Sequence, residues 1–148
     1  MADSPQLPDW PAGTVAILVT GGARPHAIPV SAVLRAGPRR MLVGLAHSRE
    51  SLARLRQSPQ VTVAICARAV AVSVDGRASV LVEEIVKGVA AVAVDVEVIH
   101  DHDRPTLALH AGVAWEWTDE EAARRDGEVR AALSGLAAAT EAPEDHRL

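Results

Sequence analysis

Alternation of apolar and polar residues late in the chain constrains the fold more than any other feature. Valine occupies every second position from Val92 to Val98, while Asp95 and Glu97 point the other way. Successive side chains of a strand point to opposite faces, so this pattern predicts antiparallel strands with one buried face. Residues 106–117 repeat the pattern, with Leu107, Leu109, Ala111, Val113, Trp115 and Trp117 on one face and Thr106, His110 and Glu116 on the other.

The first half of the chain predicts further short strands separated by turn residues. The apolar residues are mostly valine and alanine, with no Phe and no Tyr, which favours strands. Gly21-Gly22 is typical of a hairpin turn, and Asp75-Gly76 marks either a bend or a second hairpin. The expected strands are residues 15–20, 25–34, 41–45, 61–67 and 69–83.

Two helices are expected beside these strands. A short helix follows Ser48, which is a good N-cap, and Leu52 and Leu55 give it an apolar stripe. A second helix begins at Thr118, which forms a T-x-x-E capping box with Glu121. Its expected ion pairs are Glu120 with Arg124 and Glu121 with Arg125, and its apolar stripe is Val129, Ala132, Leu133 and Leu136.

These elements predict a mainly β fold. Six or seven antiparallel strands cannot cover all their edges in a flat sheet, whereas a barrel can. We therefore expect six to seven antiparallel strands in a closed or split β-barrel, with one short inserted helix and a C-terminal helix. The chain of 148 residues suits one domain, over residues 14–140, with a flexible N-terminal arm over 1–13 and a frayed tail over 141–148.

Composition narrows the function. The net charge of −4 offers no basic field, so nucleic acid is not an expected partner. No apolar run approaches the length of a membrane span and no leader opens the chain, which predicts a cytoplasmic protein without a membrane partner. The single cysteine, Cys66, lies in an apolar strand and is expected to be a buried small hydrophobe, with a reactive thiol as the alternative.

The start of the short helix is the best candidate for a binding site. Arg49 and Ser51 are expected in its first turn, where free amides and the helix dipole attract anions. A cation is disfavoured there, so Arg49 makes most sense beside a bound anion. The alternative is a capped surface helix with a solvated arginine.

Other candidate motifs are weaker. The glycines match no phosphate-binding loop, and no serine lies in a G-x-S-x-G motif. Within residues 100–103, His-Asp-His-Asp, two side chains at most can share an ion, so we interpret the run as a polar turn and assign no metal site. His26 is interpreted as a surface or interface residue, and no catalytic residue is identified.

Three segments together resemble a known family. TVAILVTGGARPHAIPVSAV, MLVGLAHSRESLARLRQSPQVTVAI and VDGRASVL, within residues 14–82, are similar to the flavin-binding split-barrel proteins related to pyridoxamine 5′-phosphate oxidase. That group includes deazaflavin-dependent relatives. The resemblance implies a homodimer that holds FMN, or alternatively a deazaflavin, at its interface.

The resemblance also implies which residues hold the cofactor. The ring would lie against Pro29, Val30, Ser31, Leu45, Ala46 and His47, and the phosphate against Ser48, Arg49 and Ser51. Trp115 or Trp117 would cover the ring or close the dimer, the alternative being simple packing at the barrel end. Many relatives have Lys or Arg where Ser51 falls and Asn where Arg54 falls, so Arg49 would have to supply the missing charge.

The implied activity is that of a flavoprotein oxidoreductase acting on a small molecule of unknown identity. The C-terminal segment that contacts pyridoxine phosphate in true oxidases has no match, which argues against that particular activity. The alternative is a non-catalytic flavin or haem carrier with the same fold.

Overall fold

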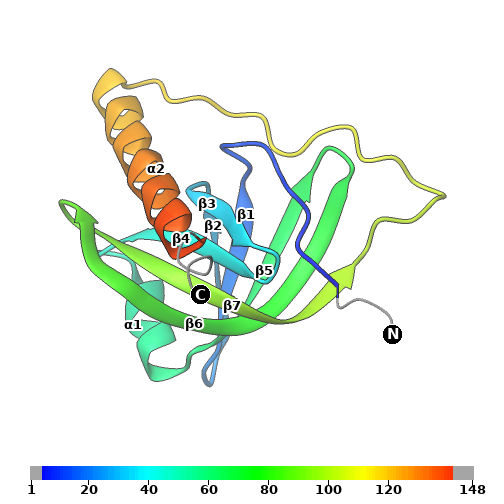
Figure 1. The fold of residues 1–148 in the computed structure, drawn as a ribbon, viewed down its shortest axis with the longest axis horizontal. Helices are drawn as coiled ribbons and strands as arrows, with labels where there is room; N and C mark the ends of the chain where they lie inside the picture. The colour runs from blue at the N-terminus through cyan, green and yellow to red at the C-terminus, as the bar shows by residue number, and fades with distance from the viewer. Residues whose placement is uncertain (1–4, 142–148) are drawn as a thin grey trace, which may run out of the picture.

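The computed structural model describes residues 5–141 and forms seven strands and two helices there (Figure 1). All paired strands are antiparallel, in the order β2-β1-β5-β6-β7-β4-β3. The predicted mainly β fold with an inserted and a C-terminal helix is confirmed. The elements are β1 (Ala16–Thr20), β2 (His26–Val30), β3 (Val33–Gly37), β4 (Arg40–Ala46), α1 (Glu50–Gln57), β5 (Gln60–Ala67), β6 (Val70–Val86), β7 (Val89–Asp101) and α2 (Glu120–Glu141).

The curved sheet encloses one core of aliphatic side chains. Met41, Val63, Ile65, Val74 and Val92 are fully buried there. Helix α2 lies outside the barrel across β3 and β4 (Figure 1), where its apolar stripe meets a second cluster that includes Leu42 and Ala93. Within that stripe Val129 and Leu133 are buried, as the sequence predicts.

The strands differ from prediction at two places. The expected strand over residues 25–34 is interrupted after Val30, so β2 and β3 are separate. Asp75-Gly76 bends β6 without ending it: Asp75 pairs with Val98 and Gly76 with Val96, which leaves Glu97 as a bulge. A bulge reverses the alternation that follows it. Val98 is therefore exposed instead of sharing the buried face, while Ile99 packs against the core.

The predicted strand over residues 106–117 is wrong. Residues 102–119, hereafter the strap, run as an extended segment from β7 to α2 without entering the sheet (Figure 1). The strap contacts the turn between β5 and β6 at isolated points: the Ala69 amide donates to the Leu109 carbonyl at 3.0 Å, and Gly112 lies against the Cys66 carbonyl. Alternation alone does not supply a partner strand, and the apolar side chains Leu107, Val113, Trp115 and Trp117 stay exposed.

Both helices begin one residue later than predicted. The N-cap of α1 is Arg49, with extended φ and ψ of −77° and 133° and no side-chain cap bond, so Ser48 precedes the cap. The Asp119 carboxylate accepts a hydrogen bond from the Ala122 amide at 2.8 Å, so Asp119 replaces Thr118 as the cap of α2. Arg124 pairs with Glu121 and Glu128 instead of the expected partners.

Two further expectations change. Cys66 is exposed, because β5 turns its neighbours Ile65 and Ala67 into the core. The described part of the predicted arm packs on the barrel: Leu7 is buried, its amide donates to the Pro38 carbonyl at 2.8 Å, and the Trp10 indole donates to the Val33 carbonyl at 3.0 Å. Residues 1–4 of that arm and the tail beyond Glu141 lie outside the described residues. No helix in residues 5–141 is long and apolar enough to cross a membrane.

Candidate functional site

Most of the predicted binding residues meet at one cavity. This cavity, of about 320 Å³ and hereafter the Arg49 cavity, lies between the β2–β3 connection, β4 and α2. Pro29, Val30, Ser31, Leu45, Ala46, Arg49 and Trp117 line it, as do Ala32, Gly44, Val89, Ala122, Arg125, Asp126 and Val129. Its volume is at the lower end of the range for small-molecule sites.

The backbone explains how the walls come together. The chain turns between β2 and β3, and the Gly44 amide donates to the Ala32 carbonyl at 2.9 Å, which ties this turn to β4. A Cβ on Gly44 would lie 2.9 Å from Cγ1 of Val129 and 3.5 Å from Leu133. The missing side chain therefore lets α2 pack close to β4 and complete the cavity.

The Arg49 cavity carries excess positive charge. The Arg49 side chain is exposed and makes no hydrogen bond or ion pair with any residue that the structure describes. Arg125 donates to the neutral carbonyl of Lys87 at 3.5 Å, so its charge is not cancelled there. Asp126 forms an ion pair with Arg130 at 2.8 Å. A cation at the N-cap of a helix is disfavoured by the dipole unless an anion lies between them, so the cavity suits an anion beside apolar walls.

Four predicted residues do not line this cavity: His47, Ser48, Ser51 and Trp115. Ser51 is a fully buried residue of α1, and within the described residues its hydroxyl has no hydrogen-bond partner. It shares the inward face of α1 with Leu52 and Leu55. The His47 ring is held instead by the Glu83 carbonyl, 2.7 Å from Nε2.

Arg54, where many relatives have Asn, is occupied within the protein. Its guanidinium donates to the Glu50 carboxylate at 2.6 Å and to the Arg24 carbonyl at 2.9 Å. The hydrogen bond from Arg54, with its charge, holds the pKa of Glu50 below its usual value. Arg49 is therefore the unpaired cation at the start of α1.

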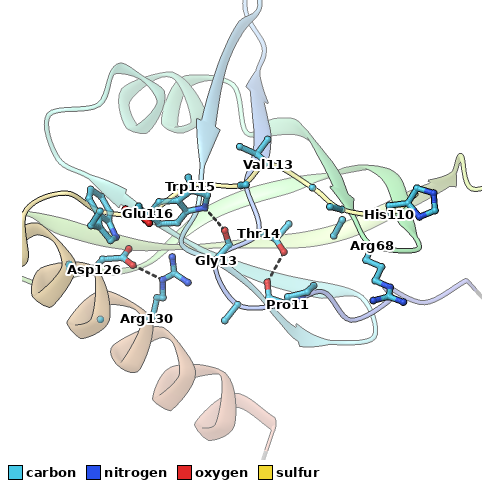
Figure 2. A pocket seen from close by; sticks show the side chains of 18 residues that line it. Pro11, Gly13, Thr14, Arg68, His110, Val113, Trp115, Glu116, Asp126 and Arg130 are labelled. Carbon is cyan, nitrogen blue, oxygen red and sulfur yellow. Dashed lines mark hydrogen bonds and ion pairs between the residues drawn. The ribbon is translucent and has the colours of Figure 1, made fainter. Parts of the chain in front are cut away.

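A second and larger cavity adjoins the first. It has a volume of about 820 Å³ and lies between the strap, residues 11–14 and α2, and we call it the strap cavity (Figure 2). Trp115 lines it, and Trp117 and Asp126 line both cavities. The two indoles meet edge to face, with centroids 5.3 Å apart and planes at 87°. The alternation of residues 106–117 predicts that these rings are neighbours, but no sequence signal pointed to residues 11–14.

His100 at the end of β7 and His102 at the start of the strap lie elsewhere. His100 Nε2 lies 3.1 Å from Asp75, whose other oxygen accepts from Thr62 at 2.8 Å, and His102 Nε2 lies 2.9 Å from the Ser73 hydroxyl. The Thr62 hydrogen bond, followed by that of His100, lowers the pKa of Asp75. Among residues 5–141, no three His, Cys, Asp or Glu side chains are grouped so that they could hold a metal ion.

Comparison with solved structures identifies the fold. A protein assigned as a pyridoxamine 5′-phosphate oxidase from Listeria innocua has 16% identity and a TM-score of 0.53, over 62% of this chain and 90% of that chain. An F420 reductase has 9% identity and a TM-score of 0.52, over 60% and 90%. A protein assigned as a flavin reductase from Haemophilus somnus has 13% identity and a TM-score of 0.52, over 62% and 81%.

No protein-family model and no curated protein sequence matches the chain. At such low identities the structural likeness shows the fold and no more. The fold that these structures share with the chain is the split barrel. In particular, the chain has the fold of the pyridoxamine 5′-phosphate oxidase-like proteins, as the three sequence segments predict.

Proposed function

We propose that this protein binds FMN, or alternatively a deazaflavin, in the Arg49 cavity and acts as an oxidoreductase on a small molecule. The observation that carries the proposal is the unpaired Arg49 guanidinium at the N-cap of α1, beside an apolar cavity lined by the end of β2 and by β4. Solved structures that share the fold include proteins named as flavin and F420 reductases.

The residues present fit a flavin. Arg49 and the free amides at the start of α1 would hold its phosphate, because both attract an anion. Pro29 offers an exposed apolar side chain to the ring, and Trp117 lies on the α2 side of the cavity. Val30 and Leu45 also line the cavity, although both are buried in the core. A bound flavin supplies hydride chemistry, while the protein orients it and excludes water.

A second copy of the chain is part of the proposal. On the outer face of the sheet Ile17 pairs with Pro29 on one side and with Ala64 on the other, and Ile17 is 39% exposed. Cys66 and Ala71 continue this small, uncharged face. Such an apolar face is typical of an interface. Because Pro29 belongs both to this face and to the Arg49 cavity, the partner would lie beside the cofactor.

A carrier is the second candidate function. Among the described residues the one carboxylate that lines the Arg49 cavity is Asp126, and its ion pair with Arg130 occupies it. No free acid or base therefore faces a bound ring. Direct hydride transfer needs none, but neither does a protein that holds a flavin or haem without reacting.

Thermal unfolding and turnover test the proposal in that order. FMN or a deazaflavin at a hundred times its dissociation constant should stabilise the fold by about 2.7 kcal/mol, which raises Tm by roughly 5–10 °C for a chain of this length. A colourless protein whose Tm does not move with either ligand contradicts the binding claim. Stable binding without turnover of quinones, flavins or tetrapyrroles would instead support the carrier.

A further inference from the structure

We propose that the strap cavity binds the substrate, and that this substrate is a planar aromatic anion. The inference rests on the proposed function, since it places the reacting molecule beside the flavin. Trp117 and Asp126 line both cavities, so a molecule in the strap cavity and a molecule in the Arg49 cavity are separated by one indole ring and one carboxylate.

The two tryptophans form a preorganised aromatic surface. Trp115 and Trp117 are 37% and 45% exposed, although burying them would stabilise the fold. Trp115 is held at its edge and over one face: its N–H donates to the Gly13 carbonyl at 2.8 Å, and the Arg130 guanidinium lies over the ring, 5.8 Å from its centroid. An exposed indole held in one orientation, with a second indole in edge-to-face contact, suits a flat ring better than a flexible aliphatic chain.

Charges at the two ends of the cavity differ. Figure 2 shows Trp115, Asp126 and Arg130 toward one end, and Arg68 and His110 toward the other. At the tryptophan end the Arg130 charge is matched by Asp126, and the Glu116 carboxylate adds a negative charge. Arg68 is exposed and has no hydrogen bond or ion pair with the described residues. The acidic group of the ligand therefore lies at Arg68, and its ring lies on the indoles.

The walls between the ends combine two glycines with the side chains of Pro11, Thr14 and Val113 (Figure 2). A Cβ on Gly112 would lie 2.5 Å from the Cys66 carbonyl oxygen. Only glycine therefore lets the strap pass this close to Cys66 and Ala67, which precede Arg68. Gly13, with φ of +86°, lies beside the Arg130 guanidinium on the opposite side. The two glycines therefore let the strap approach the β5–β6 turn and let residues 11–14 approach Arg130, which brings the walls of the cavity together.

Calorimetric titration of the full chain with 2-naphthoate and with neutral 2-naphthylmethanol tests the proposal. We expect the anion to bind about three- to tenfold more tightly, because an exposed guanidinium contributes modestly to such a pair. Arg68→Ala should abolish this preference and Arg68→Lys should restore part of it. Arg77→Ala is the matched control, since Arg77 is also exposed and lines neither cavity. Trp115→Ala should weaken both ligands about two- to tenfold.

A parallel titration with FMN separates this inference from the proposed function. In FMN-loaded protein 2-naphthoate should shift the flavin absorption band without releasing FMN, and Arg68→Ala should leave FMN affinity unchanged. If wild-type protein binds FMN but binds neither naphthalene, or retains its preference in Arg68→Ala, the substrate site is refuted while the flavin site stands. Release of FMN by 2-naphthoate also refutes it, since the two would share one site. If FMN does not bind but the preference depends on Arg68, the proposed function fails and the aromatic anion site remains.

Discussion

Trp115 and Gly13, which are 102 positions apart in the chain, are joined by a 2.8 Å hydrogen bond from the indole N–H to the glycine carbonyl. The bond fixes the strap to the segment before β1 and so shapes the strap cavity. It also turns one face of Trp115 toward Arg130. The arrangement of the larger cavity therefore depends on this contact.

Trp115→Phe should lower the free energy of unfolding by about 0.5–1 kcal/mol, because the aromatic ring is kept and one hydrogen bond is lost. Urea denaturation measures this change. Trp117→Phe is the control, since the Trp117 N–H has no hydrogen bond within the described residues. Equal losses in both variants would contradict a structural role for the Trp115 hydrogen bond.

Two glycine substitutions should act in opposite directions. A Cβ on Gly76 would lie 2.6 Å from the Asp95 carbonyl oxygen, so Gly76→Ala should destabilise the fold by about 1–3 kcal/mol. Gly135 lies in α2 with nothing within 4 Å of an added Cβ, so Gly135→Ala should stabilise the fold by about 0.5–1 kcal/mol. Chemical denaturation of both variants checks the signs. A neutral Gly76→Ala would show that β6 and β7 are not as close at the bulge as the structure has them.

Asp75 should contribute to stability above about pH 4 and lose that contribution in more acidic solution. Its pKa is lowered in the folded state, first by the Thr62 hydrogen bond and then by His100, so the folded state favours the ionised carboxylate. The stabilisation is present above the unfolded pKa and is lost as the pH falls through the folded one. NMR titration of the Asp75 carboxyl carbon measures this pKa.

Thr62→Val should raise the pKa of Asp75 toward its ordinary value, and His100→Gln should raise it less. NMR titration of the Asp75 carboxyl carbon measures the pKa in both variants, which differ only in the hydrogen-bond partner of Asp75 that is removed. A pKa that does not move in Thr62→Val would contradict the hydrogen bond between Thr62 and Asp75 as its main cause.

Ile17→Glu should convert a dimer into a monomer, because it places a charge at the centre of the proposed interface between Pro29 and Ala64. Sedimentation velocity at micromolar concentration measures the change. Leu81→Glu is a suitable control: Leu81 has nearly the same exposure, 37%, but lies farther along β6. A wild-type protein that sediments as a monomer would remove the dimer from the proposal.

Local sequence signals were enough for both helices and for most of the strands. The structure confirms the apolar stripe of α2 and the buried face of β7 that Val92, Val94 and Val96 share. The other face of β7 is buried as well at Ala91 and Ala93, because α2 covers it. The bulge at Glu97 depends on how β6 and β7 pair, which no single strand encodes. For the same reason the strap has the pattern of a strand but has no partner in the sheet.

The candidate site was predictable where its residues are close in sequence. The segments around Pro29 and Arg49 follow from the resemblance and from the helix start, and they line one cavity. Arg125, Asp126 and Val129 were not foreseen as cavity residues, because their place depends on how α2 docks against Gly44. Ser51 was expected to face a phosphate, but it lies four residues before Leu55 and so belongs to the inward face of α1.

Calorimetric titration of the protein with FMN and with riboflavin, which lacks the phosphate, tests phosphate binding by Arg49 most directly. Wild-type protein and the Arg77→Ala control should bind FMN about tenfold or more tightly than riboflavin, since a charged hydrogen bond contributes roughly 1.5–3 kcal/mol. Arg49→Ala should reduce that ratio toward one while riboflavin affinity stays unchanged. Equal affinity of wild-type protein for the two ligands, or an undiminished ratio in Arg49→Ala, would contradict the account.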